Sequence, residues 1–328
     1  MSLKSKNKKT QKPRSDAIDK SSNKGSSKLF TVLFRVITLI AVIVLVYCGY
    51  KYFSQWWDYH NSNVTYEKIK NDGVVDNDGS SLGDETEEID KTDLIGIDWD
   101  SIKHKDLVAW IQMDSISYPV YHDDGSQYYL RHLPDGTYAT AGSIFLYGEN
   151  SADFTDLSSF IYGHNMANGT MFGSLKNYVD DKYKDHKFYI YLPDGTRHTY
   201  QFFAVATVPQ SSQAYTWSFA NDDSFKNWQM FLKEMSLVNC TAQVDTTKKY
   251  VTLSTCNGSY GTTKRLIITG QEIKVDKVQK PAGWYDEYAA SIANKNSQRQ
   301  KVAEDVQTTL SSIQSSKRKE LYDERRKK

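Results

Sequence analysis

The sequence predicts a mainly β fold, a barrel that is closed or nearly closed, behind a single membrane-spanning helix. Short alternating or apolar runs recur between residues 116 and 275, and turn signals such as LPDGT separate them. Seven or eight short strands within about 160 residues are typical of such a barrel. A long apolar run near the N-terminus predicts the membrane-spanning helix.

The N-terminal region has the charge pattern of a membrane anchor. Residues 1–28 contain nine Lys or Arg and two Asp, with almost nothing apolar, so we expect a disordered basic tail. The run that follows carries one charge, Arg35, and about 33 Å of helix crosses a bilayer, so we expect a transmembrane helix over 29–53. A cleaved signal peptide is the alternative, but the bulky KYFSQWWDYH that follows lacks the small residues of a cleavage site. The basic flank places the N-terminus in the cytoplasm and the rest outside.

Charge also sets the limits of the exported domain. Residues 71–100 contain eleven acidic residues and one basic residue, which predicts an acidic extracellular linker over 54–97. The DNDG at 76–79 is a weak alternative signal for a calcium loop, with Glu87 at its twelfth position. We expect the exported domain over 98–275.

The last segment, residues 276–328, has twelve basic and eight acidic residues and reads as a charged extension, helical or disordered. The formal net charge is +1, so no global field indicates nucleic acid as a partner. No phosphate-binding glycine loop or paired-cysteine metal motif is present, so we expect no metal and no cofactor.

The predicted elements of the exported domain follow from periodicity. Apolar spacing over 99–113 predicts one helix or two short ones. Two helical insertions are expected, over 169–185 and over 222–235, the second capped by Asp222 or Asp223. The predicted strands lie in 116–122, 142–148, 158–165, 187–192, 199–208, 249–256 and 265–275.

The stretch VTLSTCNG places Cys256 at the end of a strand and beside a glycine turn. An extracellular cysteine there is a buried apolar residue, half of a disulfide or a nucleophile. Its disulfide partner would be Cys240, in a segment that could pair with the cysteine strand. These three interpretations stay open on the cysteine alone.

Two further residues favour the nucleophile. A thiol with a pKa of about 8.5 needs a proton acceptor, and His164 ends the apolar strand SSFIY as Cys256 ends its own. The other histidines lie before the barrel or among turn residues: His60, His104, His122, His132, His186 and His198. After the turn NGSYGTTK, an antiparallel return sets Arg265 beside Cys256, where a guanidinium can stabilise an oxyanion.

TLSTC, the arginine nine residues later and YGHN upstream resemble the signature of sortases, the membrane-anchored cysteine transpeptidases of Gram-positive bacteria. The resemblance extends over about residues 98–275 and is strongest to class B members. It implies an eight-stranded barrel of mixed strand direction, with N-terminal helices and a helical insertion before the cysteine strand. Cys256 would attack a C-terminal sorting motif, NPQTN-like or LPxTG-like, and cut after its threonine.

The resemblance also implies roles and partners. A thioester on Cys256 would be transferred to an amine of a peptidoglycan precursor or of a pilin, with His164 as acid and base and Arg265 on the oxyanion. Asn257 stands where some class B members have an acid, so the expected set is Cys–His–Arg. Candidate substrate-binding residues are Ser254, Thr255, Asn165 and Tyr215. The alternatives are a secreted cysteine peptidase that uses water and a membrane-tethered binding barrel with a structural cysteine.

Overall fold

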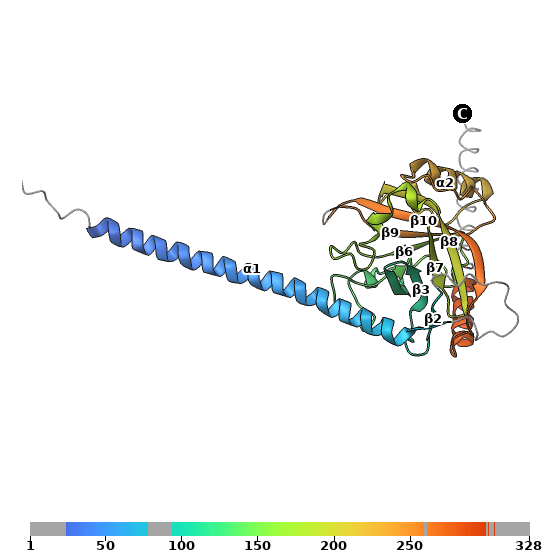
Figure 1. Ribbon diagram of the computed structural model, residues 1–328, viewed down its shortest axis with the longest axis horizontal. Coiled ribbons are helices and arrows are strands. Elements are labelled where there is room, and N and C mark those ends of the chain that lie inside the picture. Colours follow the sequence, from blue (N-terminus) through green and yellow to red (C-terminus); the bar gives the residue numbers. More distant parts are fainter. Residues whose placement is uncertain (1–23, 78–93, 259–260, 300, 302–304, 306–328) are drawn as a thin grey trace, which may run out of the picture. The chain divides into compact units, whose positions relative to one another are not determined.

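The computed structural model describes residues 24–77, 94–258 and 261–299, together with residues 301 and 305 (Figure 1). Most of the possible calcium loop therefore lies outside the described residues. The chain divides into two compact units, residues 1–57 and 58–328. Helix α1, Lys24–Gly73, begins in the first unit. From Leu29 it is long and apolar enough to cross a membrane, and its large apolar side chains there are exposed.

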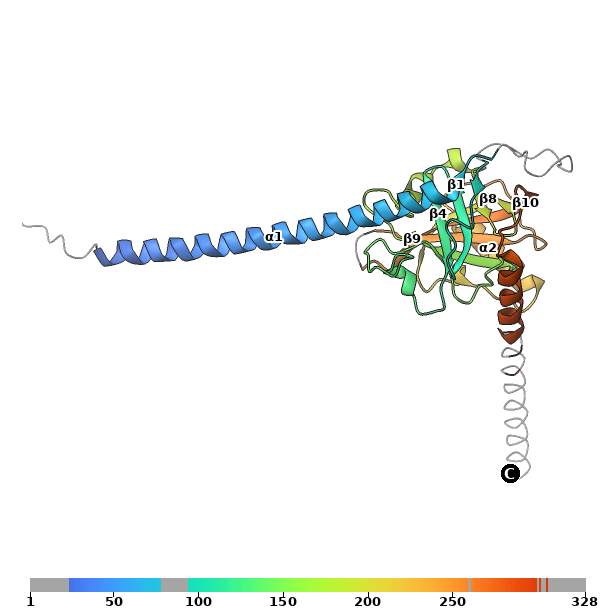
Figure 2. The same ribbon diagram turned by 90° about the horizontal axis from the view of Figure 1, so that it is seen from below.

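Eight strands of the second unit form a closed barrel in the order β10-β8-β7-β3-β4-β5-β6-β9 (Figures 1 and 2). The pairs β4–β5 and β6–β9 are parallel and the other pairs are antiparallel. The predicted fold class, a mixed eight-stranded barrel, is confirmed. The strands are β3 Leu107–Met113, β4 Ile116–His122, β5 Phe145–Leu146, β6 Ser158–Tyr162, β7 Lys187–Tyr191, β8 Thr196–Pro209, β9 Tyr250–Cys256 and β10 Lys264–Lys277. A small antiparallel sheet joins β1, Val74–Val75, to β2, Gly96–Ile97.

The two faces of each strand belong to different clusters, because successive side chains of a strand point to opposite sides. On β9, Val251 and Leu253 pack in the large cluster of buried residues inside the barrel. Tyr250 instead joins a second cluster on the outer face, which residues of α2 cover. The even-numbered positions of β9 therefore face the insertion that follows β8.

The predicted helix over 99–113 is wrong, because residues 107–113 form strand β3. All but one of its side chains are buried: Ala109, Ile111 and Met113 face the interior cluster, whereas Trp110 packs in an outer one. A strand buried on both faces reads as a nearly continuous apolar run, and such a run also fits a helical stripe.

The second predicted insertion is confirmed as helix α2, Asp222–Met235. Its N-cap, however, is Asn221 rather than Asp222 or Asp223. The Asn221 side chain accepts a hydrogen bond from the Ser224 N–H at 2.9 Å, and the Ser224 hydroxyl lies 3.2 Å from the Asn221 N–H. This reciprocal capping box satisfies two N–H groups at the helix start.

The insertion predicted over 169–185 is not one helix. It contains two short 3₁₀ turns, η3 Leu175–Tyr178 and η4 Asp181–Tyr183. Asp180 separates them, because its extended backbone and its side-chain bond to the Lys182 N–H start a new turn instead of continuing the first. Two further 3₁₀ turns, η2 Tyr128–Leu130 and η5 Gln213–Tyr215, lie in the loops after β4 and β8.

The chain after β10 packs back onto the barrel. Gln279 makes two hydrogen bonds of 2.9 Å to the backbone of Ile97. Residues 285–299 are helical, and Ile292 is 6% exposed within the interior cluster (red in Figure 2). Arg299 donates to the backbone carbonyls of the loop at residues 148–150. The described part of the extension is therefore integrated with the barrel.

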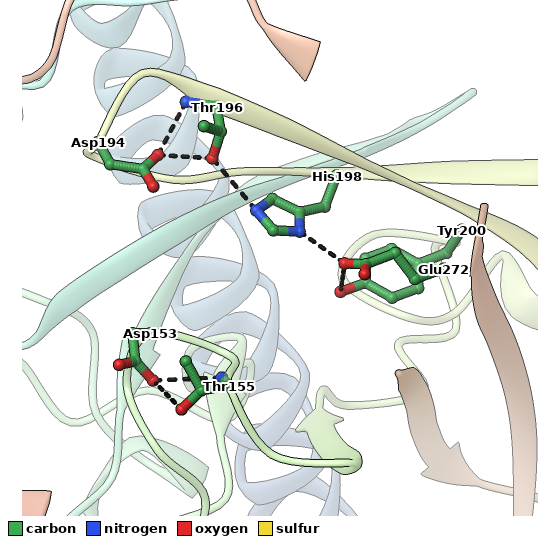
Figure 3. Close-up of polar contacts among 7 residues, drawn as sticks. All are labelled: Asp153, Thr155, Asp194, Thr196, His198, Tyr200 and Glu272. Carbon is green, nitrogen blue, oxygen red and sulfur yellow. Dashed lines mark hydrogen bonds and ion pairs between the residues drawn. The ribbon is translucent and has the colours of Figure 1, made fainter. Parts of the chain in front are cut away.

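A polar chain joins the start of β8 to β10 (Figure 3). Thr196 Oγ1 lies 3.1 Å from His198 Nε2 and also contacts the Asp194 carboxylate. His198 Nδ1 lies 2.7 Å from Glu272 Oε1, and Tyr200 approaches the same carboxylate oxygen at 3.4 Å. Burial raises the pKa of Glu272, but the hydrogen bond and charge of His198 outweigh it and hold that pKa below its usual value.

Candidate active site

Cys256 lies at the end of β9, between β6 and β10. In the antiparallel register with β10, Cys256 faces Arg265 directly, as the sequence predicts. Both residues are at strand ends, where the ladder stops and a side chain reaches solvent. The thiol is partly exposed, so a substrate can reach it.

His164 follows from the parallel register of β6 with β9. Tyr162 is level with Ser254, and the Gly163 N–H continues the ladder to the Ser254 carbonyl at 3.2 Å. A continuation of this register by two residues, beyond the end of β6 at Tyr162, sets His164 opposite Cys256. Since the shift is two residues, both side chains belong to the same face as Tyr162 and Ser254. Cys256 and Arg265 therefore face each other on β9 and β10, and His164 follows the end of the neighbouring strand β6 by two residues.

The imidazole of His164 has a defined hydrogen bond. Its Nε2 lies 2.8 Å from the carbonyl oxygen of Leu130, at the end of η2. A carbonyl only accepts, so Nε2 carries the hydrogen and Nδ1 is the nitrogen that is left to exchange a proton. Burial lowers the pKa of His164, and the positive charge of Arg131 adds to this against the opposing effect of the Leu130 bond. The neutral imidazole is therefore favoured at neutral pH.

The guanidinium of Arg265 is held by three acceptors. Nη1 donates to the carbonyls of Thr262 at 2.8 Å and Lys264 at 3.1 Å, and Nη2 donates to Gln210 Oε1 at 3.0 Å. A guanidinium has five N–H groups, so within the described part of the chain two are left for a ligand. The connection between β9 and β10 is also anchored to β8, because Asn257 Nδ2 donates to Thr207 Oγ1 at 2.8 Å.

The predicted substrate-binding residues divide into two groups. Tyr215, from η5 in the insertion, lies 2.7 Å from the Ser254 hydroxyl and stacks on Tyr162 with ring centroids 6.3 Å apart. Burial raises the pKa of Tyr215, and the charges of Arg265 and Cys256 act on it in opposite directions. Tyr215 and Ser254 therefore lie on the face of the nucleophile.

Thr255 and Asn165 are placed differently. Thr255 alternates with Cys256 and faces the barrel interior, where its buried hydroxyl has no hydrogen-bond partner among the described residues. Asn165 lies beside His164 and donates from Nδ2 to the Cys256 carbonyl at 2.8 Å. Its amide donor is thus engaged with the protein backbone.

The disulfide interpretation does not fit the register. Cys240 is buried and Cys256 is partly exposed, and both thiols are free. Thr241, next to Cys240, accepts a bond from Gln201, which is level with Gln271 and through it with Tyr250. Cys256 lies at the other end of β9, about 20 Å along the strand, whereas a disulfide needs Cα atoms within about 7 Å.

Two contacts of the site could not be read from sequence. The Leu130 carbonyl comes from a loop 34 residues before His164. Gln210, one residue beyond β8, gives no signal except its place opposite a predicted strand end. Within the residues that the structure describes, no group of three or more His, Cys, Asp or Glu is arranged to hold a metal ion.

The chain is similar to several known proteins. Residues 111–273 match the model of the Sortase domain. The chain is 26% identical to sortase B of Listeria monocytogenes over 252 residues, 74% of this chain and 98% of that protein. It is 24% identical to sortase B of Staphylococcus aureus over 246 residues, 73% of this chain and 96% of that protein. The crystal structure of sortase B from B. anthracis in complex with AAEK1 aligns with a TM-score of 0.53 and 24% identity, over 67% of this chain and 99% of that one.

Proposed function

We propose that this chain, which belongs to the sortase family of cysteine transpeptidases, cleaves exported proteins at a C-terminal sorting motif. The motif is NPQTN-like or LPxTG-like and is cut after its threonine. The acyl group then passes to an amine of the cell wall or of a pilin. The observation that supports the proposal is the placement of Cys256 and Arg265 opposite each other on β9 and β10, with His164 just after the end of the adjacent strand β6.

The proposed reaction has two acyl transfers. The Cys256 thiol transfers its proton to Nδ1 of His164, the resulting thiolate attacks the threonine carbonyl carbon, and the guanidinium of Arg265 donates to the oxyanion. His164 protonates the leaving amine, so the peptide C–N bond breaks and a thioester remains. An incoming amine then attacks the thioester carbon and loses a proton to His164. The C–S bond breaks, the new amide is released, and the Cys256 thiolate takes its proton back from His164.

The proposed substrate contacts are those on the face of the nucleophile. Tyr215 and Ser254 form a hydroxyl pair next to Cys256, at the root of the insertion. Hydrogen-bond donors and acceptors of this kind can hold the backbone and polar side chains of an extended peptide. The sequence also suggests Thr255 and Asn165, but Thr255 is buried and the Asn165 amide donates to the Cys256 carbonyl, so neither belongs to the proposed substrate contacts.

The proposed location follows from the N-terminal segment. The basic flank of α1 puts the N-terminus in the cytoplasm of a Gram-positive cell and the barrel outside the membrane. The enzyme would then meet both partners at the outer membrane surface: exported proteins with a sorting motif, and a peptidoglycan precursor or pilin with an amine.

The test is incubation of the full chain with sorting-motif peptides and an added amine, read by mass. The expected product is the peptide joined through its threonine to the amine, and Cys256→Ala should form none. Only hydrolysed peptide at saturating amine would favour the cysteine peptidase. Full activity in the Cys256→Ala variant would exclude both enzymes that use this thiol and leave the binding barrel.

A further inference from the structure

Asn165 occupies the position where the β6–β9 ladder breaks off. In a parallel ladder each N–H rung is followed by another two residues later on both strands. The last backbone rung runs from the Gly163 N–H to the Ser254 carbonyl at 3.2 Å. The next would run from the Asn165 N–H to the Cys256 carbonyl, and the Asn165 side chain takes its place at 2.8 Å.

The backbone of this segment has turned toward another loop. Asn165 forms an antiparallel bridge with Met171, and the Phe172 N–H donates to the His164 carbonyl at 3.0 Å. The chain therefore leaves β9 at the residue that carries the imidazole. One amide keeps the two segments joined.

We propose that Asn165 is a positioning residue that sets the separation of the Cys256 thiol and the His164 imidazole, and that it is not a substrate contact. The hydrogen bond joins the backbone next to both functional groups. Its donor, Asn165, directly follows His164, and its acceptor is the backbone carbonyl of Cys256. The proposal rests on the assigned roles of Cys256 and His164. It differs from the role that sequence suggests for Asn165, and the two roles have different kinetic consequences.

The contact has the properties that positioning requires. It is partly buried, so water competes less for it than for a surface bond. The imidazole has its own anchor at Leu130 on the far side. With Asn165 removed, the histidine loop keeps that anchor while the end of β9 loses its link to the loop, so the thiol–imidazole separation is no longer fixed.

The experiment measures the reactivity of Cys256 without any substrate. Full-length protein in detergent is alkylated with iodoacetamide from pH 5 to 9, and the adduct at Cys256 is quantified by peptide mass. The variants are Asn165→Leu, which removes the donor, and Asn165→Asp, which puts an acceptor against the carbonyl. Asn168→Asp is the matched control, because it adds the same charge in the same loop and keeps the oxygen that accepts from Thr170.

Positioning predicts that both Asn165 variants change the pH profile of Cys256 alkylation, because the thiol no longer lies at a fixed distance from the imidazole that exchanges its proton. In peptide cleavage they should lower kcat about tenfold and leave KM within about twofold, because ground-state binding is unchanged. Asn168→Asp should match the wild type in both assays.

A raised KM with an unchanged alkylation profile would overturn the proposal in favour of substrate binding, as would a shift of equal size in Asn168→Asp. Two Asn165 variants are used so that the result does not depend on one of them folding. The alkylation experiment also separates this inference from the proposed function. If no peptide in the panel is cleaved, the profile still tests Asn165, and if peptides are cleaved while the profile is unchanged, only the positioning role fails.

Discussion

Replacing Arg265 with lysine tests whether the shape of the cation, rather than its charge, supports the reaction. Three of the five guanidinium N–H groups are held by Thr262, Lys264 and Gln210, so the plane of the guanidinium is fixed opposite Cys256, and among the described residues two N–H groups have no partner. An ammonium keeps the positive charge, but its three N–H groups rotate about one bond and cannot keep all of these acceptors. Arg265→Lys thus removes the oriented pair and leaves a point charge.

The magnitude follows from the donors that are lost. Removing one oxyanion donor lowers kcat by about 10² to 10³ in enzymes that stabilise tetrahedral intermediates. Because the retained charge still attracts the oxyanion, we expect the lower end, a loss of about 100-fold, or about 2.7 kcal/mol of transition-state stabilisation. KM should change by less than about threefold, since the donors act on an atom that is charged only in the transition state.

The assay is the initial rate of sorting-peptide cleavage at saturating amine, with wild type and variant at equal thiol content. Lys187→Arg on β7 is the matched control, because it makes the reverse exchange away from the nucleophile and should keep full activity. A kcat for Arg265→Lys within about threefold of wild type would remove the guanidinium from the mechanism.

Two further predictions concern ionisation and stability. Because burial lowers the pKa of His164, the unfolded chain binds its proton at higher pH than the folded one, so this residue costs stability as pH falls below about 6.5. The unfolding free energy of wild type should therefore decline relative to His164→Gln between about pH 7 and 5 in chemical denaturation, and a constant difference would contradict the burial. His198→Leu should lower the unfolding free energy by about 2 kcal/mol at pH 7, because it leaves Glu272 with a buried carboxylate beside an apolar group. This loss should shrink below about pH 4, as Glu272 is protonated, and kcat should stay within about twofold; an equal loss at acid pH would mean that packing, not the charge pair, is responsible.

The site was predictable because it depends on local patterns that register converts into proximity. The alternating strand before Cys256, the apolar strand before His164 and the turn before Arg265 can each be recognised alone. The barrel topology then pairs β9 with β10 antiparallel and β9 with β6 parallel, which brings the three segments together. The exact two-residue extension of the β6 register could not be derived from sequence, since period-2 patterns fit several registers of the same parity.

What could not be predicted depends on contacts distant in sequence. Residues 107–113 look helical because both faces of β3 are buried, and only the assembled barrel supplies the second layer. Asn165 suggests a substrate contact by its place after His164, but its partner is a backbone carbonyl 91 residues away. Such side-chain-to-backbone bonds leave no sequence pattern, because any residue can supply the carbonyl.

Cys256 can be a buried apolar residue, half of a disulfide or a nucleophile, and these three interpretations predict different reactivities for the thiols of Cys240 and Cys256. Burial raises the pKa of Cys240, so its thiolate is scarce as well as inaccessible, whereas Cys256 is partly exposed next to an imidazole. At pH 7, brief treatment of native protein with iodoacetamide should label Cys256 at least about tenfold faster than Cys240, and denaturant should abolish the difference. Peptide mass distinguishes the sites, and Cys240→Ser controls for indirect effects, because it should leave the labelling of Cys256 unchanged. A disulfide predicts that neither cysteine is labelled until a reductant is added, and a purely structural Cys256 predicts slow labelling at both. Either outcome would contradict the nucleophile, because both transfers of the proposed reaction require a free, reactive thiolate at this position.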